Sequence, residues 1–147
     1  MAEAIGADEI LVRIPSRLEI LDVVDKVASA IAEHMEFPEE EANSIANSVI
    51  EAGTNAIQHG HFLDADLPVD FLFQIGADAL RVRVSDQGPG FDVEAVLRSD
   101  PTSPDSLLAS RGRGIFIMKS LMDEVSFEML PRRGCTVVLT KRLKRGS

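Results

Sequence analysis

Two short runs of alternating apolar and polar residues, 69–75 and 80–85, constrain this chain more than any other feature. A period of two is typical of half-buried strands. The tight turn Gly76-Ala77-Asp78 connects the runs, and so short a connection permits only antiparallel pairing. In the second run the valines face one side and the arginines the other. The fold therefore contains an antiparallel sheet with one buried face.

Three further strands and three helices follow from the same kind of periodicity. The strands span residues 9–14, 125–130 and 135–142, and the helices span about 16–35, 38–59 and 112–122. Ser16 is the expected N-cap of the first helix, and the third helix is expected to begin directly at Gly112. This order predicts an α/β sandwich. A mostly antiparallel, mixed sheet of about five strands would be covered on one face by three helices.

Length and composition indicate one folded domain. The 147 residues, of which 45% are hydrophobic and 27% charged, can bury a core without staples. No apolar run approaches the roughly 18 residues of a membrane span, and the acidic N-terminal residues lack the basic region of a secretory signal. The single cysteine, Cys135, excludes an internal disulfide and a multi-cysteine zinc site. We expect residues 1–147 to form a single cytoplasmic domain without membrane association.

The net charge of -9 is unevenly distributed. All 24 acidic residues precede residue 130, whereas residues 131–147 hold six basic residues and no acidic one. A basic end can bind nucleic acid, but the acidic body would repel a phosphate backbone. We therefore expect no direct nucleic-acid binding. Residues 141–147 are interpreted as a short basic tail that follows a solvated edge strand.

Three polar residues recur at intervals of four in the second predicted helix: Glu51, Asn55 and His59. This spacing places them on one helix face, beside the apolar stripe that packs on the sheet. A solvated polar flank is the alternative for such a triplet taken alone. The triplet is nevertheless a candidate site because a carboxylate and an amide project together.

A glycine-rich turn, Asp86-Gln87-Gly88-Pro89-Gly90, follows the second strand of the first hairpin. Asp86 at the strand end can accept a hydrogen bond from an exocyclic amine such as that of adenine. Gly88 and Gly90 permit a close approach of the backbone. A tight turn with an Asx-type hydrogen bond is the alternative.

A third candidate is the run Arg111-Gly112-Arg113-Gly114-Ile115. Glycines that open a helix leave free N–H groups at the positive end of the macrodipole, which favours an anion. The two arginines add positive charge. Glycines that only cap the helix are the alternative.

In this order the three elements resemble the ATP-binding boxes of the GHKL, or Bergerat-fold, family. The resemblance covers about residues 10–143. The form EAGTNAIQHG at 51–60, with LMDEV at 121–125 and GCTVVL at 134–139, is similar to the bacterial anti-sigma-factor serine/threonine-protein kinases of partner-switching systems. That family usually has a hydroxyl residue where this chain has Cys135.

The resemblance implies a role for each matched residue. Glu51 would be the general base that takes a proton from the attacking hydroxyl. Asn55 would coordinate Mg²⁺, which prefers oxygen ligands, and Asp86 would read adenine. Gly88 and Gly90 would let the backbone pass close to the nucleotide.

The remaining matches would bind the phosphates and cover the nucleotide. Backbone N–H groups would cradle the phosphates, an arginine would neutralise developing charge, and a threonine of the last strand would lie near adenine. The residues are, for the cradle, Gly112, Arg113, Gly114 and Ile115; for the charge, Arg111 or Arg113; and near adenine, Thr136. Residues 93–111 would form the ATP lid, with a short helix at either end.

The implied function is that of an ATP- and Mg²⁺-dependent serine/threonine-protein kinase and anti-sigma factor. It would phosphorylate a STAS-domain anti-sigma-factor antagonist, sequester a sigma factor, and form a homodimer. The alternatives are a switch kinase or ATP-binding module of the same fold with a non-sigma partner, and a histidine-kinase catalytic domain. The last is disfavoured because no helix hairpin with a phosphoacceptor histidine precedes the boxes.

Overall fold

The computed structural model describes residues 8–61, 64–98, 107–130 and 134–144. Five strands form one sheet in the order β1-β2-β3-β5-β4, and every neighbouring pair is antiparallel. The strands are β1 (Glu9–Pro15), β2 (Pro68–Ile75), β3 (Ala79–Asp86), β4 (Glu124–Leu130) and β5 (Gly134–Arg142). The predicted sheet is confirmed, although it is wholly antiparallel within the described residues and not mixed. β5 lies between β3 and β4, so the expectation of an edge strand before the basic tail is wrong.

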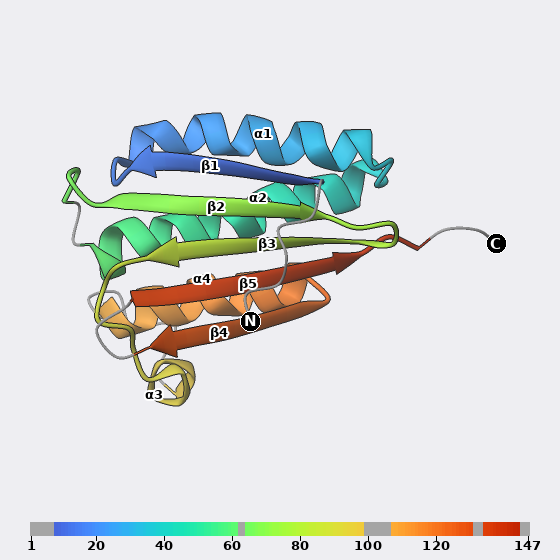
Figure 1. The fold of residues 1–147 in the computed structure, drawn as a ribbon. Coiled ribbons are helices and arrows are strands. Elements are labelled where there is room, and N and C mark those ends of the chain that lie inside the picture. The colour runs from blue at the N-terminus through green and yellow to red at the C-terminus, as the bar shows by residue number, and fades with distance from the viewer. Residues whose placement is uncertain (1–7, 62–63, 99–106, 131–133, 145–147) are drawn as a thin grey trace.

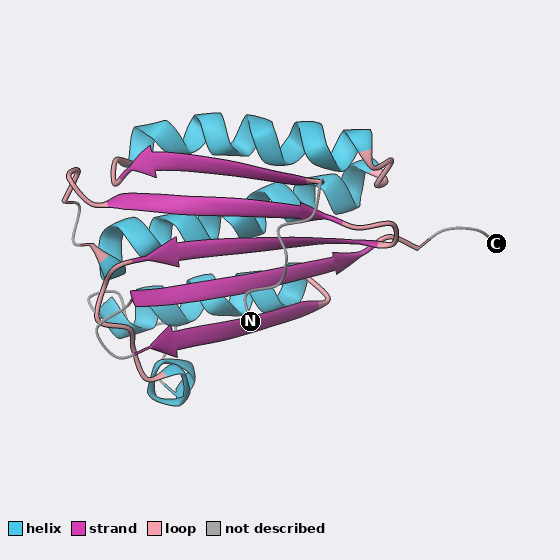
Figure 2. Cartoon of the chain, in the orientation of Figure 1, coloured by secondary structure: helices cyan, strands magenta, loops and turns pink. Residues whose placement is uncertain are grey.

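Three long helices cover one face of the sheet, as predicted (Figures 1 and 2). They are α1 (Leu21–His34), α2 (Glu39–Asn55) and α4 (Leu107–Leu121). A fourth, short helix, α3 (Val93–Arg98), lies beside the β4 edge. α2 continues directly into a π-helical turn, η2 (Ala56–Gly60), so the second helical segment ends at the predicted glycine.

The core lies between α2 and the centre of the sheet. The predicted apolar stripe of α2 is buried, with Ile45 and Val49 fully inaccessible. Phe71 and Phe73 on β2 and Val82 on β3 face it and are also fully buried. Burial alternates strictly along β3, as the period-two pattern predicts. The centre of the core is thus the α2 stripe packed on the apolar face of the β2–β3 hairpin, and α1, α4 and β5 add buried apolar residues around it.

The start of the first helix differs from the prediction. A 3-10 turn, η1 (Leu18–Ile20), precedes α1, and no side chain caps either element. The Ser16 hydroxyl donates to the carbonyl of Leu67 at 2.6 Å and lies 2.8 Å from Nδ1 of His61. Ser16 is therefore not an N-cap, because its hydroxyl is engaged by distant segments.

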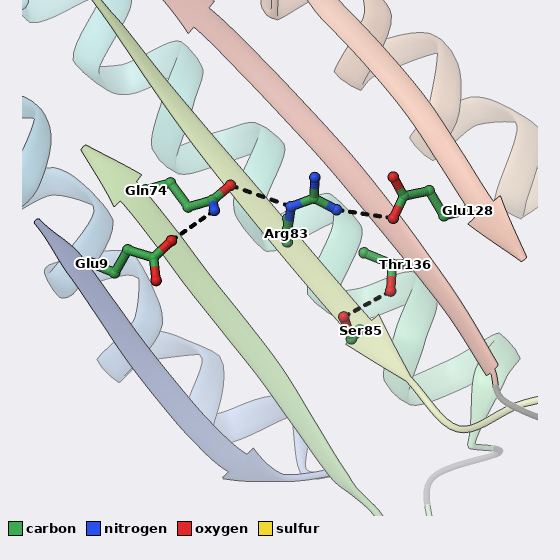
Figure 3. Close-up of polar contacts among 6 residues, drawn as sticks. All are labelled: Glu9, Gln74, Arg83, Ser85, Glu128 and Thr136. Carbon is green, nitrogen blue, oxygen red and sulfur yellow. Dashed lines mark hydrogen bonds and ion pairs between the residues drawn. The ribbon is translucent and has the colours of Figure 1, made fainter. Parts of the chain in front are cut away.

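The opposite face of the sheet carries polar side chains that bridge strands (Figure 3). Gln74 donates to Glu9 at 2.7 Å and accepts from Nε of Arg83 at 3.2 Å, and Arg83 also contacts Glu128 at 2.9 Å. Polar bridges on this face therefore extend from β1 to β4. No helix within the described ranges is long and apolar enough to cross a bilayer.

Candidate functional site

Glu51 and Asn55 lie together where α2 meets α4, which confirms that the two side chains project together. A Cβ atom on Gly114 would lie 3.0 Å from Nδ2 of Asn55 and 3.2 Å from Oε2 of Glu51. A side chain at this position would force Asn55 and Glu51 to shift, so the glycine permits this close approach of α4 to α2. Burial raises the pKa of Glu51, which makes its carboxylate a better proton acceptor than an exposed one.

The third helix begins earlier than the sequence predicts. α4 starts at Leu107, so Gly112 and Gly114 lie inside it. Only the first four N–H groups of a helix lack an intrahelical acceptor, and these glycines come later. Gly114 is thus a glycine of the α2–α4 contact and does not mark a helix start. Gly112–Ile115 therefore does not present free N–H groups here, and Ile115 is fully buried in the core.

Asp86 ends β3 as predicted and is only 7% exposed. The Gly88 N–H donates to its Oδ1 at 2.7 Å. Gly60 presses on the carboxylate, since a Cβ there would lie 2.7 Å from Cγ of Asp86. Burial raises the pKa of Asp86 and the Gly88 hydrogen bond opposes that rise. Gly90 has φ 78°, which turns the chain away after this carboxylate is fixed.

The two arginines of the glycine run differ sharply. Arg113 is exposed, whereas Arg111 is 9% exposed, with its guanidinium 3.9 Å from the centre of the Phe91 ring. Burial lowers the pKa of Arg111, while the charge of Asp86 raises it. Nε of Arg111 is buried and has no hydrogen-bond partner among the described residues. Arg111 thus belongs to the Asp86 end of the site, a place that the sequence did not indicate.

The last strand brings Cys135, and not Thr136, to Asp86. Cys135 pairs with Asp86 across β3 and β5, and burial together with the Asp86 charge raises the pKa of its thiol to about 11. Thr136 shares a 2.8 Å hydrogen bond with Ser85 on the open face of the sheet (Figure 3). Successive strand residues point to opposite faces, so the structure does not place the Thr136 side chain with the other site residues.

Two histidines, His59 within the π-helical turn and His61 directly after it, were given no role by the resemblance. His59 follows Glu51 and Asn55 at the same spacing of four residues, and its buried Nε2 atom has no hydrogen-bond partner in the described part of the chain. Burial and the charge of Arg111 lower the pKa of His59. His61 is 2% exposed, and its Nε2 accepts a hydrogen bond from the backbone N–H of Gln87 at 2.7 Å. Its partners are distant in sequence, so no local pattern could have found it.

The residues present suit a metal ion that is coordinated by few protein atoms and mainly by a bound phosphate compound and water. No group of three His, Cys, Asp or Glu residues in the described part of the chain could hold an ion alone. Asn55, 7% exposed, instead offers one hard oxygen beside the carboxylate of Glu51. Mg²⁺ is commonly held this way, by few protein oxygens together with phosphates and water.

Comparison with known proteins identifies the family to which the chain belongs. Residues 14–141 match the family described as "Histidine kinase-like ATPase domain". The chain is 33% identical over 144 residues to the serine-protein kinase RsbW of Bacillus licheniformis, covering 95% of this chain and 89% of that protein. The RsbW of Bacillus subtilis is 31% identical over 142 residues, covering 94% and 88%.

A solved structure shares the fold. A Mycobacterium tuberculosis protein with RsbU and RsbW domains superposes with a TM-score of 0.68 at 16% identity. The match covers 97% of this chain and 34% of that one, so this chain spans about a third of the longer protein. The chain belongs to the histidine kinase-like ATPase domain family, among the relatives of the RsbW serine-protein kinases.

Proposed function

We propose that this chain is an ATP-dependent serine/threonine-protein kinase and anti-sigma factor of a bacterial partner-switching pathway. Its substrate is a STAS-domain anti-sigma-factor antagonist. The observation that carries the proposal is the junction of Glu51, Asn55 and Gly114 between α2 and α4. The kinase names of relatives that match nearly the whole chain support it.

Each part of the site has one task in this proposal. Asp86, fixed by Gly88, accepts a hydrogen bond from the adenine amino group. Asn55 holds Mg²⁺, which when bound neutralises phosphate charge. Glu51 accepts the proton of the substrate hydroxyl as the hydroxyl oxygen bonds to the γ-phosphorus and ADP leaves. The raised pKa of Glu51 suits this step.

Residues 93–111 act as the ATP lid in this proposal. α3 and the first turn of α4 belong to it, and residues 99–106 lie outside the described residues. Arg111 contacts the Phe91 ring and interacts with the charge of Asp86. In this proposal nucleotide binding displaces Arg111 and opens the first turns of α4, which frees the N–H groups of Gly112–Ile115 for the phosphates. Hydrogen exchange in α4 on addition of a non-hydrolysable ATP analogue measures this change.

The kinase proposal is tested by phosphoryl transfer to a purified STAS protein from the same organism. The expected product is acid-stable phosphoserine or phosphothreonine on that protein, in the presence of ATP and Mg²⁺. Acid-labile label on a histidine would instead indicate a histidine-kinase domain. Saturable ATP binding without transfer to any STAS protein would reduce the chain to an ATP-binding module.

Capture of partners tests the regulatory half of the proposal. A sigma factor should co-purify with the chain in the presence of ADP or ATP, and light scattering should report a homodimer. A STAS protein captured without any sigma factor would indicate a switch kinase with another target.

A further inference from the structure

The buried His61 lies at the centre of a chain of hydrogen bonds. Its Nε2 accepts from the backbone N–H of Gln87 at 2.7 Å, and its Nδ1 lies 2.8 Å from the Ser16 hydroxyl oxygen. That hydroxyl lies 2.6 Å from the carbonyl oxygen of Leu67. These hydrogen bonds therefore join four segments of the protein: the end of β1, the residue after η2, the loop before β2 and the turn after β3.

The donors and acceptors fix the state of the ring. A backbone N–H can only donate, so Nε2 of His61 carries no proton. A carbonyl can only accept, so the single hydroxyl proton of Ser16 points to Leu67. Nδ1 must then carry the ring proton and donate to Ser16. His61 is thus a neutral imidazole in its Nδ1–H form, with both nitrogens satisfied.

This ring acts on the backbone that carries Asp86. Gln87 lies between Asp86 and Gly88, and the Gly88 amide donates to the Asp86 carboxylate. Gly60, the residue before His61, presses on the same carboxylate. A Cβ on Gly88 would clash with the carbonyl oxygen of Gly60. The segment 60–61 therefore holds the turn at three adjacent places.

We propose that His61 is a positioning residue for the adenine subsite: its Nε2 holds the Gln87 amide and so fixes the carboxylate of Asp86. The inference rests on the proposed role of Asp86 in nucleotide binding and adds a residue to it. An apolar ring would fill the same space but leave the partly buried Gln87 N–H without its acceptor.

Two amide variants separate the two sides of the ring. His61→Gln can place an oxygen at the position of Nε2 and keep the Gln87 hydrogen bond. His61→Asn reaches only the position of Nδ1 and keeps the Ser16 contact. His34→Asn, on the exposed side of α1, is the matched control.

We expect His61→Asn to weaken ATP binding by about 5- to 10-fold, the effect of one hydrogen bond. It should also reduce the preference for ATP over GTP, measured by calorimetry where every variant is folded. His61→Gln should stay within about twofold of the parent, and His34→Asn should be unchanged. The proposal would be overturned if His61→Asn and His61→Gln bound ATP with equal affinity. Both variants could keep the parental affinity, or both could lose affinity together with a lower Tm, and either result would overturn it.

The ring state and the turn can be tested without nucleotide. The ¹⁵N spectrum of His61 should show a protonated Nδ1 and an unprotonated Nε2, and the Gln87 amide should be protected from exchange in the parent but not in His61→Asn. An Nε2–H ring, or an equally protected Gln87 amide in that variant, would overturn the inference. A parent with this spectrum that fails to bind ATP would instead refute the proposed function.

Discussion

The core beneath α2 and the site at the end of β3 lie on the same side of one sheet, yet different interactions hold them. In the core, Ile45, Val49 and Phe71 are fully buried and apolar. At the site, Asp86 and Arg111 are buried polar groups, and Nε of Arg111 has no hydrogen-bond partner within the described ranges. Apolar packing stabilises by area removed from water, whereas a buried polar group costs free energy until it is paired.

The difference implies a division between stability and function. Substitutions in the core should lower the free energy of unfolding and leave chemistry intact in the molecules that remain folded. Substitutions at the site should change binding or rate with little effect on unfolding. Measuring both quantities for each variant tests the division directly.

The largest effect is expected for Glu51→Gln. The amide keeps the size of the side chain but cannot accept the hydroxyl proton, and general-base catalysis contributes about 10² to 10⁴-fold. Single-turnover transfer to the STAS partner should fall by that factor, with ATP affinity and Tm nearly parental. Transfer at the parental rate would show that Glu51 is not the base.

Asn55→Asp is the matched variant one turn away on the same helix. It alters the proposed Mg²⁺ ligand, so it should change Mg²⁺-dependent ATP affinity, which Glu51→Gln leaves alone. If both variants lost affinity equally, the face would bind nucleotide as a unit and the division of roles between base and ligand would fail.

The second effect is on stability and concerns Ile45→Ala. Removal of a fully buried isoleucine side chain from a packed core costs about 2–5 kcal/mol. Urea denaturation should show this loss, and Ile45→Val a loss of about 0.5–1.5 kcal/mol. ATP affinity of the folded fraction should be parental in both. A large change in affinity would mean that core and site are coupled.

Local patterns predicted the core well and the site unevenly. The hairpin of β2 and β3 and the α2 stripe were found because periodicity is a property of neighbouring residues. The start of α4 was not, because the close contact of Gly114 with Asn55 links separate helices. Thr136 was expected near adenine, whereas the structure brings Cys135 to Asp86. The difference is one position along β5, and one position moves a side chain to the other face of the sheet. His61 was missed because its partners lie 45 and 26 residues away.

The third effect is on specificity and concerns Asp86→Asn. An amide can present a donor where the adenine amino group needs an acceptor, and a hydrogen bond to a charged group contributes about 1.5–3 kcal/mol. The preference for ATP over GTP should fall by roughly 10- to 100-fold. Calorimetry with both nucleotides measures it. An unchanged preference would remove Asp86 from the adenine subsite.

The smallest effect is the pH dependence of Glu51. Its pKa is raised by burial, so the transfer rate should fall at acid pH with a midpoint above the ordinary value of about 4.3. The residual rate of Glu51→Gln should not show this fall at acid pH.

The same pKa shift affects the stability of the fold in the opposite sense, since stability falls as pH rises. A raised carboxylate pKa stabilises the folded state below the pKa of the unfolded chain, and this contribution is lost as pH rises through the folded pKa. Above the folded-state pKa, the buried ionised carboxylate lowers the free energy of unfolding of the parent. Glu51→Gln has no such loss. One pKa unit corresponds to about 1.4 kcal/mol and partial exposure reduces it, so the variant's Tm should equal or slightly exceed the parent's near neutral pH. Thermal unfolding of both proteins across the same pH range measures the gap. A variant clearly less stable than the parent at neutral pH would mean that the ionised carboxylate holds the α2–α4 junction together, and the separation between core and site would not extend to Glu51.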